Sequence, residues 1–392
     1  MFLTNMCIGP FKRLCHWGPI TAFVIIKLVT CMTAYCCTMW WPPSNSYGGL
    51  INKSIFLIFS GLTIYNFLSA IFEGPGYLPL NWVPEDVGDE AFLQNCYSCK
   101  GFKAPRSHHC RKCGRCVLKM DHHCPWINNC VGHANHAHFT AFLLCSVFGC
   151  FHSTIILGCT LYRGINRAWY LYHGTEPVIQ LYLHTLILCV FALGLSIGVV
   201  LAVGMLLYFQ MRAILCNRTA IEEWIVEKAN HRRNVNGDKL FVFPYNLGWK
   251  KNLLQVFNWR NGTVGDGIHW PVREGCHQYT LTIEQKEQKS EKRQRTRAYT
   301  VVRKYSGHWL PVVHGWKVFS HPPFTDESRI SLQVGDTVLV TRWARFWMFG
   351  EKSTKDKKKL RGWFPRNCVV EISLCDQCDL NEYENIQLKK LI

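Results

Sequence analysis

Charged residues are scarce in four long stretches of this chain, which lie near 17–41, 51–72, 139–161 and 183–209. Each stretch is close to the ~20 apolar residues that cross a bilayer as a helix. Leu186–Phe209 contains no Lys, Arg, Asp or Glu at all, which the core of a soluble domain seldom requires. Lys27 is the one such charge away from the ends of these stretches, which is too little for an ion or proton path and argues against a transporter. The sequence therefore predicts a protein with four membrane-spanning helices.

Acidic residues are also scarce, because 26 Asp and Glu stand against 44 Lys and Arg and the net charge is +18. The basic residues are not interleaved with aromatic residues on one soluble domain, so we expect no nucleic acid partner. Anionic lipid headgroups or an acidic cosubstrate at the membrane surface suit this charge better. No small-residue cleavage site follows Lys12 and Arg13, which predicts a signal anchor. The basic residues concentrate in 73–138 and after 209, which predicts that this loop and both termini are cytosolic.

Seven cysteines lie between Cys96 and Cys130, several of them in C-x2-C pairs. In the reducing cytosol such pairs bind metal or take part in catalysis rather than form disulfides. Six of these thiols and two imidazoles would complete two tetrahedral zinc sites of three thiolates and one imidazole each. These ligands are Cys96, Cys99, His109, Cys110, Cys113, Cys116, His123 and Cys130, although spacing alone does not separate His109 from His108. Because this loop is poor in apolar residues, bound metal would supply its folding energy.

Cys124 is the thiol left over from this ligand count. It precedes Pro125, which favours an extended backbone, and residues two apart in an extended segment share a face. His122 would then lie beside Cys124, while His123 points the other way, toward metal. A thiolate is a strong nucleophile, and a neighbouring imidazole or metal ion lowers the pKa of the thiol from which it forms. Asp121 can orient His122 for this role. If Cys124 were another zinc ligand, the ligand count would be odd and Asp121 would have no role.

This Cys-rich segment resembles the DHHC family of protein S-acyltransferases. The matching positions are Cys96-x2-Cys99, Lys103-Ala-Pro105, His109-Cys110-x2-Cys113-x2-Cys116, Asp121-His-His-Cys124-Pro-Trp, Cys130-Val-Gly and Asn135 to Phe139. Outside it, Glu73-Gly-Pro-Gly76, Thr219-Ala-Ile-Glu222 and Asn252 resemble further family elements, and Thr219, Glu222 and Asn252 are expected to support the site. Ala220 stands where the family has a hydroxyl residue that supports the catalytic acid, so the sequence leaves that contact unassigned.

The resemblance implies a two-step reaction. Cys124 would attack a long-chain acyl-CoA, most simply palmitoyl-CoA, with His122 as general base and Asp121 orienting it. Cysteines of membrane-associated proteins on the cytosolic side would then receive the acyl group. The resemblance assigns one zinc to Cys96, Cys99, His109 and Cys116, and the other to Cys110, Cys113, His123 and Cys130. A membrane-anchored zinc scaffold, such as a RING-like ubiquitin ligase, is the alternative, but it has no use for an Asp-His-Cys group.

The last part of the chain contains short β-rich runs separated by turn residues. This segment resembles an SH3 domain in the spacing of Gly335-Asp336, Trp347, Gly350, Gly362 and Phe364-Pro-Arg-Asn367. The resemblance implies an SH3-like barrel to which a protein partner could bind. Cys368, Cys375 and Cys378 are candidate acylation sites on the enzyme itself. The end Lys389-Lys-Leu-Ile392 resembles a dilysine retrieval signal, which predicts a multi-pass protein of the endoplasmic-reticulum membrane.

The predicted fold class is therefore an α-helical polytopic membrane protein with a zinc-stapled Cys-rich domain and an SH3-like β-barrel. The expected parts are 1–82 with the first two spans, 83–138 with the zinc domain, 139–209 with the last two spans, 210–283 as a juxtamembrane region, 284–304 as a charged linker, 305–374 as the SH3-like domain and 375–392 as the tail.

Overall fold

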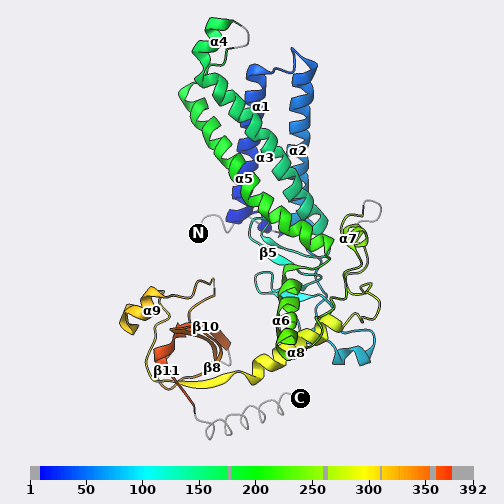
Figure 1. Ribbon diagram of the computed structural model, residues 1–392, viewed down its shortest axis with the longest axis vertical. Coiled ribbons are helices and arrows are strands. Elements are labelled where there is room, and N and C mark those ends of the chain that lie inside the picture. The colour runs from blue at the N-terminus through cyan, green and yellow to red at the C-terminus, as the bar shows by residue number, and fades with distance from the viewer. Residues whose placement is uncertain are drawn as a thin grey trace. The chain divides into compact units, whose positions relative to one another are not determined.

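The computed structural model describes residues 9–174, 178–258, 264–309, 311–325, 327–353 and 359–372. The chain divides into two compact units, Met1–Gln285 and Lys286–Ile392. The first unit contains the apolar helices and the Cys-rich segment, and the second contains a five-stranded sheet (Figure 1).

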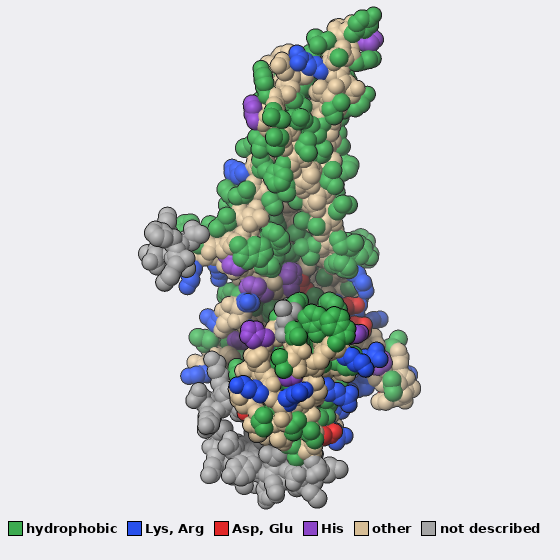
Figure 2. All heavy atoms as spheres, turned by 90° about the vertical axis from the view of Figure 1, so that its left-hand side faces the viewer, with side chains coloured by type: hydrophobic (Ala, Val, Ile, Leu, Met, Phe, Trp, Pro, Cys, Tyr) green, Lys and Arg blue, Asp and Glu red, His purple; other side chains and the backbone are tan. Residues whose placement is uncertain are grey.

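Four helices of the first unit are long and apolar enough to cross a membrane, as predicted. They are α1 (Trp17–Trp40), α2 (Tyr47–Phe72), α3 (His136–Ile165) and α5 (Leu183–Leu215). α3 packs against the other three, and the short helix α4 (Arg167–His173) follows it (Figure 1). Figure 2 shows apolar side chains over the surface of this bundle, as contact with lipid requires.

Hydrogen bonds between hydroxyl groups connect three of the spans. The Thr33 hydroxyl on α1 lies 2.6 Å from that of Ser153 on α3, which lies 3.1 Å from that of Ser196 on α5. All three residues are buried. Since the hydrocarbon core offers no water, polar groups there must find partners within the protein, and these three do so.

The Cys-rich segment folds into three two-stranded antiparallel hairpins after a short 3-10 helix, η2 (Val87–Ala91). Their strands are β1 (Gln94–Cys96) with β2 (Gly101–Lys103), β3 (His108–Cys110) with β4 (Arg115–Val117), and β5 (His122–Cys124) with β6 (Asn129–Val131). Strands of three residues bury too little apolar surface to be stable alone. The hairpins therefore depend on their cysteines and histidines, and on the helices around them.

Two further helices of the first unit are α6 (Ala220–Asn236) and α7 (Trp249–Leu254), and α8 (Thr280–Gln294) runs across the boundary between the two units. Thr219 caps α6, because its hydroxyl accepts from the Glu222 N–H while the Glu222 carboxylate accepts from the Thr219 N–H. Ile225 and Ala229 of α6 pack with Tyr245 and Trp270 in one apolar cluster. The region predicted to be juxtamembrane is thus folded around its own core.

The second unit contains an antiparallel sheet with the strand order β10-β9-β8-β7-β11. Its strands are β7 (Arg297–Val301), β8 (Thr337–Trp343), β9 (Trp347–Ser353), β10 (Lys359–Pro365) and β11 (Val369–Glu371). Short helical turns, η3 (Val312–His314), α9 (Trp316–Ser320) and η4 (Arg366–Cys368), join them, and Trp347 and Phe364 lie in the core. This unit agrees with the predicted SH3-like barrel.

The sheet begins earlier than the predicted start of the barrel at residue 305. β7 falls within 284–304, the segment expected to be a linker, and pairs with both β8 and β11. Tyr299 and Val301 on this strand are buried. The strand is short and follows the charged residues of α8, so its apolar alternation is easily missed in the sequence.

Candidate active site

The β5–β6 hairpin positions the Asp-His-His-Cys group. Because side chains alternate along a strand, His123 on β5 faces the opposite side from His122 and Cys124. Cys124 is buried, and it lies on the same face of β5 as His122. The His122 ring also packs edge-to-face on Phe139, near the start of α3, with 5.6 Å between ring centroids. The alternation predicted from Pro125 is therefore present.

Asp121 lies beside His122, and the two side chains are hydrogen-bonded. Nδ1 of His122 donates to Oδ2 of Asp121 over 2.7 Å, and the carboxylate is 1% exposed. Burial lowers the pKa of His122, but the hydrogen bonds to Asp121 and Cys124 outweigh it and raise this pKa to about 9. Burial raises the pKa of Asp121, but the hydrogen bond and charge of His122 outweigh it and hold this pKa well below its usual range. The geometry favours an imidazolium beside the Cys124 sulfur.

Two further groups hold the Asp121 carboxylate. The Ala220 N–H donates to Oδ1 over 2.7 Å, and the Gln210 side-chain amide on α5 donates to Oδ2 over 2.9 Å. The contact that the sequence left unassigned at Ala220 is thus made by the backbone. Gln210 was missed in the sequence, although an uncharged polar residue near the end of an otherwise apolar helix is a signal for a functional site.

A buried ion pair attaches α6 to the Cys-rich segment. Both Nε and Nη2 of Arg106 donate to the Glu222 carboxylate, over 2.6 and 2.7 Å, and both side chains are 0% exposed. Arg106 also donates to the side chain and carbonyl of Asn217 and lies over the rings of Tyr245 and Trp270. The sequence predicted a supporting role for Glu222 but treated Arg106 only as one of the basic residues that set the orientation of the chain in the membrane.

All four spans contribute to the apolar surroundings of Cys124. The thiol belongs to a buried cluster that also includes Ile127 and Val131. The buried members from the spans are Ala22 of α1, Phe67, Ala70 and Ile71 of α2, and Phe139, Phe142 and Leu143 of α3. Partly buried residues of the spans that pack against them are Ile26 of α1, Leu68 of α2, and Val203, Leu206 and Leu207 of α5. A group attached to Cys124 therefore lies where the Cys-rich segment meets the bundle of four spans.

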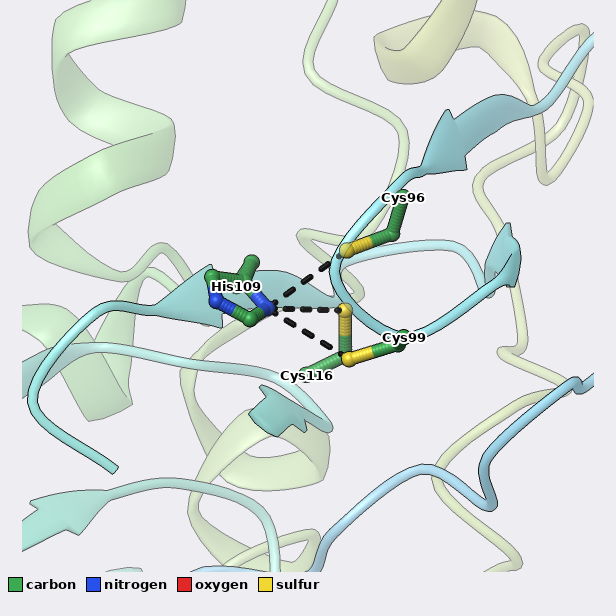
Figure 3. A group of neighbouring side chains, drawn as sticks. All are labelled: Cys96, Cys99, His109 and Cys116. Atoms are coloured by element: carbon green, nitrogen blue, oxygen red, sulfur yellow. Dashed lines mark hydrogen bonds between the residues drawn. The ribbon is translucent and has the colours of Figure 1, made fainter. Parts of the chain in front are cut away.

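The first group of metal-ligand residues consists of Cys96, Cys99, His109 and Cys116. Figure 3 shows their side chains converging from separate elements. Nδ1 of His109 lies 3.4 Å from the sulfurs of Cys96 and Cys99 and 3.9 Å from that of Cys116. Since Nδ1 of His109 is the atom aimed at the sulfurs, the structure separates His109 from His108, which the sequence could not do.

The second group consists of Cys110, Cys113, His123 and Cys130. Nδ1 of His123 lies 3.4 Å from the sulfur of Cys113 and 3.7 and 3.6 Å from those of Cys110 and Cys130. In both groups the four ligand atoms lie within 4.8 Å of one another, which fits a tetrahedral ion with three thiolates and one imidazole. These are the two sets that the family resemblance implies, and they could hold metal ions.

The remaining candidate residues differ in their surroundings. Asn252 on α7 is buried, donates to the Leu215 carbonyl at the end of α5 over 2.7 Å, and accepts from the Leu247 N–H, so it fastens the end of the fourth span. Cys368 is 0% exposed in the core of the second unit, 3.4 Å from Nδ1 of His314, which does not favour its acylation in the folded domain. Cys375, Cys378 and the dilysine end lie outside the described residues.

Comparison with known proteins agrees with this geometry. Residues 89–227 match the family model of the DHHC palmitoyltransferases, and residues 318–372 match a variant SH3 domain. The chain is 46% identical over 384 residues to a protein of Bos taurus named palmitoyltransferase ZDHHC6, with 93% of each chain covered. It is also 46% identical over 377 residues to the protein of that name from Danio rerio, with 91% of this chain and 92% of the relative covered. A probable protein S-acyltransferase 16 of Arabidopsis thaliana is 32% identical over 255 residues, which cover 59% of this chain and 83% of that protein.

These matches confirm the resemblance found in the sequence and the enzyme class, and neither a transporter nor a zinc scaffold accounts for the Asp121-His122-Cys124 geometry. With four apolar helices, a Cys-rich domain with two metal-ligand clusters and an SH3-like domain, the chain belongs to the DHHC palmitoyltransferase family.

Proposed function

We propose that Cys124 is the nucleophile that carries the acyl group in protein S-palmitoylation, with His122 as its general base and Asp121 as the group that orients the base. The observation that supports this most directly is the hydrogen bond of 2.7 Å between His122 and the buried Asp121 carboxylate, with Cys124 on the same face of β5 and in an apolar cluster to which all four spans contribute. A nucleophile, a base and an orienting carboxylate in this order form a general arrangement for covalent catalysis.

In the first step, the Cys124 sulfur attacks the thioester carbonyl of a long-chain acyl-CoA. His122 already holds the thiol proton as an imidazolium, the new carbon–sulfur bond forms from the Cys124 thiolate, and the bond to the CoA sulfur breaks. The departing CoA thiolate receives the proton from His122. The raised pKa of His122 suits this role, because the imidazolium persists at neutral pH and stabilises the attacking thiolate.

In the second step, the thiol of a membrane-associated protein attacks the acyl group on Cys124 from the cytosolic side. His122 takes the proton of the incoming thiol and returns it to Cys124 as the old bond breaks. The acyl chain would lie among Phe67, Phe139 and Leu143 while it waits, because burying a long hydrocarbon tail in an apolar site is favourable. Both reactants are thus confined to the membrane surface.

We further propose that both metal-ligand clusters hold zinc. Zinc bound there stabilises the three short hairpins, whose own apolar content is small. Cys96 and Cys99 lie at or just beyond the end of β1, and Cys116 lies on β4, so one ion joins two hairpins. The second cluster includes His123, next to His122, and therefore fixes the strand that carries the reacting groups.

The cellular setting is also a proposal. The basic residues of 73–138 support a cytosolic Cys-rich domain, and the final Lys389 and Lys390 support retention in the endoplasmic reticulum. The SH3-like domain supports a protein partner on the same side of the membrane.

Mass spectrometry of the purified protein tests the nucleophile. After incubation with palmitoyl-CoA, we expect one palmitoyl group that neutral hydroxylamine removes, on the peptide that contains Cys124. A stable modification confined to Cys368 or the tail would contradict the assignment.

A further inference from the structure

Gln210 is a buried polar side chain near the C-terminal end of the fourth span, α5. Its amide nitrogen donates to Oδ2 of Asp121 over 2.9 Å, the same oxygen that accepts from Nδ1 of His122. A primary amide has one donating end and one accepting end. The contact with a carboxylate is therefore favourable in only one of the two orientations of the Gln210 amide.

The Asp121 carboxylate selects that orientation because it can only accept, and His136 at the start of the third span supports it. Nε2 of His136 lies 3.0 Å from Oε1 of Gln210, and both residues are almost fully buried. Because the amide oxygen can only accept, Nε2 of His136 donates to it. If the amide turned over, its nitrogen would face the His136 N–H and its oxygen would face the Asp121 carboxylate, so both contacts would be lost.

Ala220 explains why this contact matters in this chain. Its methyl group cannot donate a hydrogen bond, and the position supplies only its backbone N–H to Oδ1. Asp121 is buried, so each of its carboxylate oxygens needs a hydrogen-bond donor to remain in place. With no hydroxyl at position 220, Gln210 is the side chain besides His122 that donates to Asp121 within the described residues.

We propose that Gln210 is a positioning residue for the acyl-transfer reaction, held in orientation by His136 and acting through Asp121 on His122. It provides the side-chain support for Asp121 that Ala220 lacks, and it connects the third and fourth spans to the reacting group. This inference rests on the proposed roles of Cys124 and His122.

Gln210→Met tests the proposal, because methionine has a similar volume but no donor. The measurement is the single-turnover rate of acyl-enzyme formation over a range of palmitoyl-CoA concentrations. We expect the rate at saturating palmitoyl-CoA to fall on the order of 10- to 100-fold, as expected for the loss of a buried hydrogen bond to a charged group. The half-saturating concentration should change less than about twofold, because Gln210 contacts Asp121 rather than the donor. Ser196→Ala, which removes another buried hydrogen-bonding group from the same helix, is the matched control and should keep the wild-type rate.

Rescue of the Gln210→Met variant by a second substitution tests whether Gln210 positions Asp121 or only stabilises the fold. In the Gln210→Met background, Ala220→Thr should recover at least about a third of the loss, measured on the logarithm of the rate, because it supplies a hydroxyl beside Asp121. His136→Phe leaves Gln210 intact and should lower the saturating rate about tenfold through the loss of amide orientation. This variant carries the test if Gln210→Met does not fold.

The proposal is overturned if folded Gln210→Met or His136→Phe forms the acyl-enzyme at the wild-type saturating rate, or if Ala220→Thr restores none of the loss. Cys124→Ser in the same assay distinguishes the two proposals. Acyl-enzyme formation by Cys124→Ser would refute the proposed function, whereas an inactive Cys124→Ser beside a fully active Gln210→Met would refute only the role of Gln210.

Discussion

The backbone N–H of Ala220 donates a hydrogen bond of 2.7 Å to Oδ1 of Asp121. Ala220 is the first residue of α6, so the bond brings the positive end of that helix to the buried carboxylate. A backbone donor does not depend on the side chain at its position, which explains how an alanine is accommodated there. The Asp121 carboxylate is thus held by an element that lies almost a hundred residues later in the sequence.

The buried ion pair between Arg106 and Glu222 predicts a large effect on stability. Glu222→Gln leaves the Arg106 guanidinium buried without its counter-charge and should lower the free energy of unfolding by about 3–5 kcal/mol. Thermal unfolding of the detergent-solubilised protein measures this. Glu223→Gln, which weakens the partly exposed pairs with Arg212 and Arg218, is the control and should cost at most about 1 kcal/mol. Equal losses for the two variants would contradict the account.

The close approach of α1 to the β5–β6 hairpin predicts that Gly18 cannot be replaced without a loss of stability. A Cβ at Gly18 would lie 2.0 Å from the Pro125 carbonyl oxygen, so Gly18→Ala must displace the residue next to Cys124. We expect a loss of about 1–3 kcal/mol of stability and a larger loss of acyl-enzyme formation. Gly61→Ala on α2, where a Cβ meets nothing within 4 Å, should leave both unchanged. Wild-type acylation by Gly18→Ala would show that this contact does not position Cys124.

The raised pKa of His122 predicts a pH dependence of stability. The folded protein binds this proton with a pKa of about 9, against an ordinary value of 6.5. The stabilisation is therefore complete below pH 6.5 and is lost as the pH rises through about 9. Asp121→Asn removes the carboxylate that favours the imidazolium, so the difference in melting temperature between wild type and this variant should narrow over that interval. A difference that is constant or grows with pH would contradict the proposed pairing.

The two clusters predict the metal content of ligand variants. Cys116→Ser removes a ligand of the first cluster only, so the purified protein should hold one zinc ion in place of two, measured by elemental mass spectrometry. It should also unfold at a lower temperature, because zinc binding contributes to folding. Cys216→Ser, at a half-buried cysteine outside both clusters, should keep both ions. Full zinc content in Cys116→Ser would refute the assignment of that cluster.

The sequence predicted the parts of this protein that depend on local spacing. The C-x2-C pairs, the apolar runs and the Asp121-His122-Cys124 group each lie within a short segment. Alternation along a strand was sufficient to place His122 and Cys124 on one face and His123 on the other. Arg106 and Gln210 were missed because their roles depend on contacts with residues about ninety or more positions away. Nothing in the neighbouring sequence distinguishes a buried arginine from one that sets membrane orientation.

The first strand of the barrel was missed for a related reason. Arg297–Val301 is held by its pairing with β8 and β11, which lie about forty and seventy residues later, and only Tyr299 and Val301 suggest burial beforehand. Strands are stabilised by their cross-strand neighbours more than by their own composition.

Transfer of labelled palmitate from palmitoyl-CoA, compared between wild type and Cys124→Ser, tests the central claim most directly. Both proteins should be purified with their zinc content measured, so that a folded Cys-rich domain is established for each. We predict hydroxylamine-sensitive label on the wild type, passed on to an added thiol substrate, and neither label nor transfer with Cys124→Ser. Equal label and transfer with both proteins would show that Cys124 does not carry the acyl group.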